Sequence, residues 1–295
     1  MIVNQANLHG LTVGYSTAFN KSFDTTQSNY QKVATVVPST TGEQDYKWLG
    51  QMPGMREWIG EREVQALAAY DYLIKNKKFE MTIGVPRDDI EDDKYGVYTP
   101  LFSNMGEAAA LHPDELVFGA MMSGFTEKCY DGLSFFHTAH KVGNTTYSNR
   151  SNKKLTRESY MEARSSIMSI KGNKLVPDLL VVPPALEETA RLILEADQID
   201  GTTNVLKGTA KLHVEPALAE HSEYWFLLCT NRFLKPFIYQ LRKKIKFTSL
   251  TRDTDENVFM LDEYLYGADG RSNAGYGFWQ MAYGSTGEVE AQAQG

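Results

Sequence analysis

The clearest alternation of hydrophobic and polar positions lies just before Pro86. Phe79, Met81 and Ile83 alternate with polar residues, and this period of two predicts a half-buried β-strand. Pro86 ends the strand, and an acidic run at residues 88–93 follows it. Carboxylates at a helix start compensate free N–H groups and the helix dipole, so the run predicts a helix there. A divalent-cation site is the weaker alternative, because the run lacks the alternating ligands and central glycine of a calcium loop.

Helical spacing predicts three longer helices. The first covers residues 97–122, with an apolar face formed by Leu101, Met105, Ala108 and Leu111. Pro113 is expected to break or kink this helix, because proline removes a backbone donor. The second helix begins at Thr156, and the third follows Pro184.

Short apolar stretches between polar segments predict strands in the second half of the chain. They are residues 179–182, 212–214, 225–229, 237–239, 258–266 and 276–283. Helices and strands come in mixed order without a repeating βαβ unit, which favours the α+β class.

Polar residues with scattered aromatics fill the first 41 positions. This composition predicts an N-terminal arm that is mainly extended, with room for a short helix, and that takes its apolar cover from elsewhere.

Residues 46–66 combine large apolar side chains with a Pro-Gly turn signal, which predicts a hairpin. Trp and Met side chains on a projecting hairpin need cover, and another copy of the chain is the best source. We therefore predict a subunit interface formed by Trp48, Met52, Pro53, Met55 and Trp58.

Bulk composition narrows the classes of protein. The chain has 295 residues, 42% hydrophobic and 23% charged, as is ordinary for a folded soluble protein with a substantial core. A net charge of −7 lacks the basic footprint of a general nucleic-acid-binding protein. Two cysteines do not make a disulfide framework. We expect neither a secretory signal nor a membrane span, which needs about 18 consecutive apolar residues.

Cys129, His137 and His140 form the cluster that most resembles a catalytic or metal site. Thiolate and imidazole are zinc ligands, and two histidines three positions apart can face one ion. The spacing matches no familiar zinc motif, and no fourth ligand is evident. A packed loop is the favoured interpretation, and a metal-dependent hydrolase built on these residues is the rival one.

The densest basic run is Arg242, Lys243, Lys244 and Lys246. Such a run attracts phosphates regardless of nucleic-acid sequence, so a contact with packaged DNA is one interpretation. The favoured one is a solvated strand edge that lysines protect from mispairing, or a partner for an acidic neighbour.

Several strings of residues carry a family resemblance: YKWLGQMPGMREWIGER, RDDIEDDKYGVYTPLF, HPDELVF, CYDGLSFF and AGYGFWQMA. They resemble the major head subunits of phage Mu and Mu-like prophages, within the Hong Kong 97-type family of tailed-phage capsid proteins. The similarity extends from about residue 31 to 282.

The resemblance implies a structural virion protein that is not an enzyme and uses no cofactor or metal. Its copies would form pentamers and hexamers of an icosahedral shell around phage DNA, assembled in the host cytoplasm. Implied partners are a separate scaffold protein, a portal, a decoration protein and DNA bound without sequence preference, with no membrane involved. An encapsulin-like compartment, with the same fold and an enzyme cargo, is the other alternative.

The resemblance also implies a division of the chain. Its parts would be an N-terminal arm (1–41), an extended loop (45–69), a peripheral domain with a long spine helix (70–125), an axial domain (126–230), strands returning to the peripheral domain (231–284) and a disordered tail (285–295).

Overall fold

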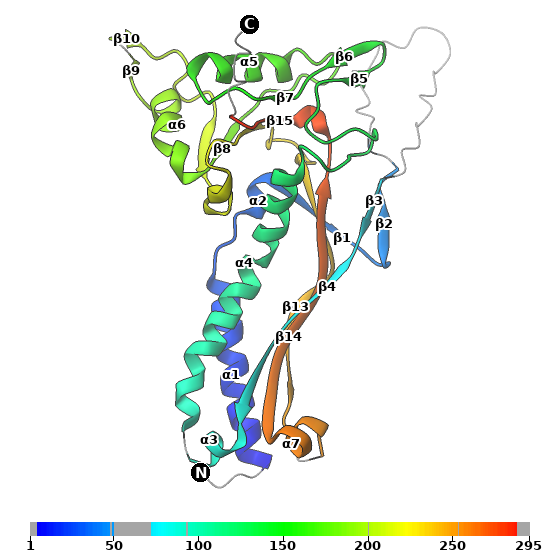
Figure 1. The fold of residues 1–295 in the computed structure, drawn as a ribbon, viewed down its shortest axis with the longest axis vertical. Coiled ribbons are helices and arrows are strands. Elements are labelled where there is room, and N and C mark those ends of the chain that lie inside the picture. The colour runs from blue at the N-terminus through cyan, green and yellow to red at the C-terminus, as the bar shows by residue number, and fades with distance from the viewer. Residues whose placement is uncertain are drawn as a thin grey trace, which may run out of the picture.

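Two sheets lie toward opposite ends of an elongated molecule (Figure 1). The computed structural model describes residues 5–47, 49, 72–92, 94–199, 201–252 and 254–287. Helices pack against both sheets, so the expected α+β class is confirmed. None of the helices in these described ranges combines the length and hydrophobicity that a membrane span needs.

The longer sheet has the strand order β1-β13-β14-β4. Its centre is an antiparallel pair, β13 (Phe237–Leu250) and β14 (Glu263–Tyr276). β4 (Lys77–Pro86) pairs antiparallel with β14, which confirms the strand predicted from the alternation before Pro86. β1 (Ala34–Pro38) runs parallel to the first five residues of β13.

Two long helices, α1 (Gln5–Thr25) and α4 (Thr99–Ser123), cover one face of this sheet (Figure 1). Their apolar side chains meet those of β14 in a core of aromatic rings, where Tyr15 stacks on Phe102 with ring centroids 4.2 Å apart. Tyr266 meets both rings edge-on. Aromatic pairs in such offset and edge-to-face geometry stabilise a core beyond their buried area.

The structure corrects the expected conformation of the N-terminal segment. It forms a 21-residue helix that buries Leu8, Tyr15 and Phe19 against its own chain, rather than a mainly extended arm. The sequence of α1 has only a weak apolar stripe, so its cover by α4 and the sheet, not its own periodicity, explains the helix.

The predicted spine helix exists, but two of its details were wrong. Pro113 lies inside one continuous helix, and the Asp114 carboxylate accepts hydrogen bonds from the backbone N–H groups of Asn29 and Tyr30. The buried face also differs in part: Met105 is buried as predicted, but Leu101 is 42% exposed, and Phe102 and Ala109 are buried instead.

The second sheet has the order β11-β8-β12-β15-β7. Its strands are β11 (Lys211–Val214), β8 (Leu179–Val182), β12 (Trp225–Leu228), β15 (Ala282–Ser285) and β7 (Arg150–Ser151). The helices α5 (Arg157–Met168) and α6 (Glu187–Leu194) lie against it. Thr156 caps α5 through the Ser159 N–H group, as its position before the apolar repeat predicts.

The remaining elements are short. They are α2 (Tyr30–Val33), β2 (Glu43–Asp45), β3 (Leu73–Lys75), α3 (Arg87–Glu91), β5 (His140–Val142), β6 (Thr145–Tyr147), β9 (Gln198–Ile199), β10 (Thr202–Thr203), α7 (Glu256–Leu261) and the 3₁₀ turns η1 (Lys94–Tyr98), η2 (Pro184–Leu186), η3 (Pro216–His221) and η4 (Trp279–Met281).

Three expectations about the end of the chain were wrong. The first part of the strand expected at residues 258–266 is the helix α7, because a short apolar run fits a buried helix turn as well as a strand. β15 joins the second sheet between β12 and β7, so the last strand does not return to the long sheet. The disordered tail was expected to start at residue 285, but Ser285 and Thr286 are buried.

Candidate functional site

The described residues that flank the predicted extended loop pair with each other, and we call this pairing its base. β2 and β3 form a two-stranded antiparallel sheet, with Glu43 opposite Lys75 and Asp45 opposite Leu73. The Tyr46 N–H donates to the Tyr72 carbonyl at 2.8 Å and extends this pairing. Residues 46 and 72, on either side of the predicted loop, are therefore held side by side.

A buried glutamine of the long sheet holds this base. The Gln240 side chain is fully buried, accepts a hydrogen bond from the Tyr46 hydroxyl at 2.9 Å, and donates to the Ile74 carbonyl at 3.0 Å. It also donates to the Asn76 side chain at 2.9 Å. Because a buried amide must keep its partners, this arrangement fixes both arms of the loop to β13. The sequence analysis missed Gln240.

Tyrosine hydroxyls link the returning arm to β14, and β14 to α4. The Tyr276 N–H donates to the Tyr72 hydroxyl at 2.8 Å, and the Tyr276 hydroxyl donates to the Ala120 carbonyl at 2.9 Å. Burial raises the pKa of Tyr46, Tyr72 and Tyr276 well above the ordinary tyrosine value. All three hydroxyls therefore keep their protons, and so remain donors, throughout the physiological pH range.

The predicted interface residues lie outside the described residues: Trp48, Met52, Pro53, Met55 and Trp58. Their neighbour Leu49 is described and fully buried in the main core.

The basic run lies on β13, where the strand loses a neighbour. β1 ends opposite Leu241, so in the described part of the chain one edge of β13 has no partner strand after that residue. Arg242, Lys244 and Lys246 are exposed, whereas Lys243 is half-buried and forms an ion pair with Asp269. The run thus contains three surface cations that form no ion pair with the described residues, and one paired lysine.

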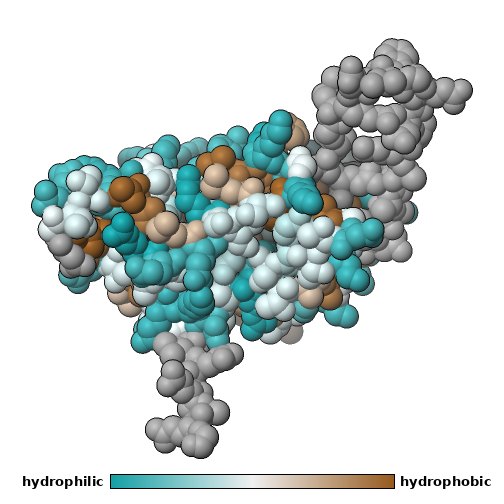
Figure 2. All heavy atoms as spheres, turned by 90° about the horizontal axis from the view of Figure 1, so that it is seen from above, coloured by the Kyte–Doolittle hydropathy of each residue, from teal (hydrophilic) through white to brown (hydrophobic). Residues whose placement is uncertain are grey.

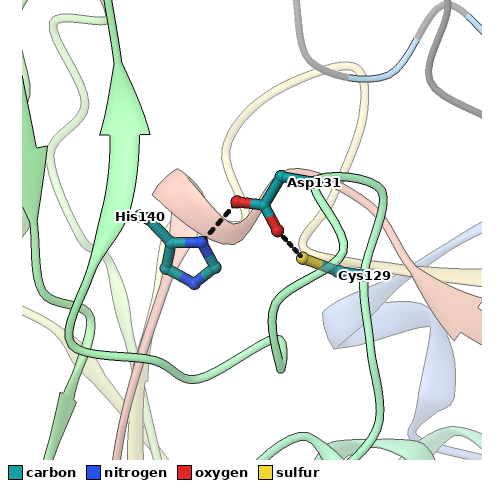
Figure 3. A group of neighbouring side chains, drawn as sticks. All are labelled: Cys129, Asp131 and His140. Atoms are coloured by element: carbon teal, nitrogen blue, oxygen red, sulfur yellow. Dashed lines mark hydrogen bonds and ion pairs between the residues drawn. The ribbon is translucent and has the colours of Figure 1, made fainter. Parts of the chain in front are cut away.

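The expected cluster of Cys129, His137 and His140 does not form as predicted. A carboxylate that the sequence analysis missed, Asp131, lies between Cys129 and His140 (Figure 3). Asp131 accepts hydrogen bonds from the Cys129 thiol at 3.2 Å and from His140 Nδ1 at 2.6 Å. His137 is turned to another role, because its Nδ1 accepts the Ala139 N–H at 3.0 Å.

This cluster satisfies its own hydrogen bonds. Nε2 of His140 faces the Phe135 carbonyl at 3.2 Å, and the ring stacks on Trp279 with centroids 4.2 Å apart, so neither ring nitrogen is directed to open space. Burial, reinforced by the Asp131 charge, raises the pKa of the Cys129 thiol far above its ordinary value. A protonated thiol is neither a nucleophile nor a good zinc ligand.

Burial opposes ionisation of Asp131, but its hydrogen bond to His140 and the charge of that ring outweigh burial and lower the Asp131 pKa. The atoms of Cys129, Asp131 and His140 that could bind a metal ion lie within 4.8 Å of one another. A metal ion there would have to break the hydrogen bonds that join these side chains. The geometry fits a structural hydrogen-bonded cluster and disfavours the hydrolase interpretation.

Large apolar side chains remain exposed on the described surface, and they gather at both ends of the molecule. Seen from the end that carries the second sheet, hydrophobic residues form separate patches in a polar surface (Figure 2). The exposed apolar residues toward this end include Met161, Met168, Leu192, Val205 and Phe233. Patches of this kind are typical of protein–protein contacts.

Comparisons of the sequence with known proteins identify capsid subunits as relatives of this chain. The family model described as Mu-like prophage major head subunit gpT matches residues 8–153, 147–218 and 217–294. The FluMu major head subunit of Haemophilus influenzae is 38% identical over 96% of this chain and 74% of its own length. The major capsid protein of Escherichia phage Mu is 35% identical over 98% of this chain and 76% of its own.

Solved structures give the same answer for the fold. The subunit in the procapsid of bacteriophage JBD30 is 38% identical and superposes with a TM-score of 0.63, over 98% of this chain and 78% of that one. A virus-like particle from Pyrococcus furiosus shares the fold at 11% identity, with a TM-score of 0.54, over 92% of this chain and 98% of that one. The expected Hong Kong 97-type fold is therefore confirmed.

Proposed function

Because this chain belongs to the family of Mu-like prophage major head subunits, we propose that its copies form the pentamers and hexamers of an icosahedral shell enclosing phage DNA. Members of this family are structural capsid proteins, not enzymes, and the chain is a component of the virion. Shell assembly would take place in the host cytoplasm. Each subunit would make many moderate contacts that are individually reversible and collectively strong.

The paired base of the loop is the observation that best supports this function. Gln240, Tyr46 and Tyr72 attach both arms of the loop to the long sheet. A loop with rigidly held arms can act as a strap, whose apolar residues Trp48, Met52, Pro53, Met55 and Trp58 become buried when a neighbouring subunit covers them. Subunits could then rotate as rigid bodies during maturation while the straps keep hold.

The division of labour between the two sheets follows from the same proposal. The second sheet with α5 and α6 would be the axial domain, at the centre of each pentamer or hexamer. The long sheet with α4 as spine would be the peripheral domain, and α1 would strengthen this domain instead of reaching a neighbour. Further partners would be a separate scaffold protein, a portal and a decoration protein. A JBD30 capsid decorated with minor capsid protein trimers, whose subunit is 26% identical to this chain, supports the last of these.

The exposed cations of β13 would serve two purposes. Arg242, Lys244 and Lys246 line a strand edge that has no partner among the described residues, where lysines prevent edge-to-edge pairing. The same cations can contact the phosphates of packaged DNA without sequence preference.

Deleting residues 51–56 tests the strap. We expect the deleted subunit to fold, because the paired base and Gln240 lie outside the deletion, but to form no closed shells. The control replaces the same six residues with glycine and serine, which keeps the length and removes the apolar side chains. Normal particles of the deletion variant in electron micrographs would contradict the strap, whereas failure of the glycine–serine variant would assign the effect to the side chains.

A further inference from the structure

The tip of the long sheet carries an unusual concentration of exposed apolar side chains. α7 lies between the end of β13 and the start of β14, at the end of the molecule opposite the second sheet (Figure 1). Its last three residues point outward, with Phe259 84% exposed, Met260 67% and Leu261 63%. Single exposed apolar residues are common, but three in succession on one helical turn call for a covering partner.

The tip is held rigidly. The Asn257 side-chain amide donates to the Leu250 carbonyl at 3.2 Å and to the Glu263 carbonyl at 2.7 Å, and so it joins α7 to both strands. Asp262 ends the helix in a left-handed conformation with φ 54°, and its carbonyl accepts the Arg87 N–H at 3.0 Å. Phe259 is therefore presented in a fixed direction, which lowers the entropy lost when it is covered.

A shallow groove lies beside this projecting ring. Its apolar lining is formed by Leu250, Met260, Leu261 and Leu265. The polar residues Thr254, Asp255, Glu256 and Asn257 complete the lining. The tip thus contains both an exposed apolar knob, Phe259, and a groove with apolar side chains in its lining.

We propose that Phe259 of one subunit inserts into the tip groove of a second copy of this chain. The proposal rests on the shell-forming function above, which surrounds each subunit with identical neighbours. Knob and groove on the same tip let each copy give and receive one contact, and such head-to-tail contacts close into a ring when the rotation between copies allows it. Each contact is small, but its repetition throughout a shell makes the tips a second set of links, independent of the extended loop.

Site-specific cross-linking between two single-cysteine variants tests this contact. The native cysteines, Cys129 and Cys229, are both buried, so an added surface cysteine is the reactive one. Phe259→Cys subunits and Leu250→Cys subunits are mixed, assembled and treated with a mild oxidant. We expect a covalent dimer on a non-reducing gel from the shells, and none from unassembled subunits at the same concentration. The control mixture pairs Leu250→Cys with Val13→Cys, an added cysteine at a 50% exposed position on α1, and should give no dimer.

A second measurement uses Phe259→Ser against Val13→Ser, a change at an exposed apolar position on α1. Loss of an interface aromatic should raise the concentration needed for shell formation about tenfold or more for Phe259→Ser, and leave Val13→Ser like the wild type. Intact shells that give no 259–250 dimer, dimers that form equally with the control, or equal assembly of the two serine variants would each overturn the tip contact. Failure of the wild-type chain to form shells would instead overturn the proposed function.

Discussion

Substitution of one glycine in α4 tests how α1 docks on its own subunit. Gly106 faces the backbone of α1, and a Cβ atom there would lie 2.2 Å from the Phe19 carbonyl oxygen and 3.1 Å from the Phe23 nitrogen. Both atoms belong to the main chain, so no side-chain rotation relieves the clash. Gly106→Ala therefore forces α1 and α4 apart by about 1 Å, because ordinary contact begins near 3.4 Å.

The magnitude follows from two opposing effects. Alanine in a helix interior is favoured over glycine by about 1 kcal/mol. Overpacking a close-packed core costs about 1–3 kcal/mol, and the displaced layer here includes the Tyr15–Phe102 stack. Gly119 lies in the same helix with no atom within 4 Å of its would-be Cβ, so Gly119→Ala gains the propensity without the clash. Both variants gain the helix propensity, so their free energies of unfolding should differ by the cost of the clash alone, about 1–3 kcal/mol.

Urea unfolding of unassembled subunits, at matched protein concentration, measures this difference. We expect a lower midpoint for Gly106→Ala and an unchanged or higher midpoint for Gly119→Ala. Hydrogen exchange should rise along α1 in Gly106→Ala alone. Equal midpoints for the two variants would refute the close approach of α1 and α4, and with it the helical, self-docked N-terminal segment.

Three further predictions concern the other features. Asp131→Ala should cost about 3 kcal/mol of folding stability because it leaves buried His140 without its partner. Asp131→Asn should cost less, since its amide oxygen can still accept the hydrogen bond from His140 Nδ1. The lowered Asp131 pKa contributes stability above about pH 4 that is lost as the pH falls through it, so the acid slope of the unfolding free energy should be smaller in Asp131→Asn. The double variant Arg242→Glu, Lys244→Glu should fold normally, and its shells should retain less DNA as the salt concentration rises. Unchanged DNA retention would show that these cations do not contact DNA and only protect the strand edge. Trp58→Ala should weaken assembly more than subunit stability, and an equal loss in both, from melting curves of shells and subunits, would place Trp58 in the core.

Local patterns in the sequence predict those elements whose stability is local. The alternation at Phe79, Met81 and Ile83 gives β4, and the Thr156 cap before an apolar repeat gives α5. The sequence does not predict the helix α1, because its apolar stripe is weak. Its stability comes from Tyr15 and Phe19 packing on α4 and the sheet, which no local pattern contains.

The long-range polar contacts are equally invisible in the sequence. In the sequence Gln240 is an ordinary polar position in a strand, and its partner Tyr46 lies 194 residues away. Asp131 lies two residues after Cys129, but acidic residues are common in loops. The spacing in the sequence therefore pointed to His137 and His140 as the partners of Cys129. The structure identifies Asp131 because burial requires a partner for both His140 and the thiol.

The central claim is that many copies of this chain build a closed shell. Electron microscopy of the purified chain, examined alone and with the proposed scaffold protein over a range of protein concentrations, tests it most directly. The account predicts rings and closed shells of uniform diameter that appear above a threshold concentration. A chain that stays monomeric at every concentration, with and without the scaffold, would contradict it.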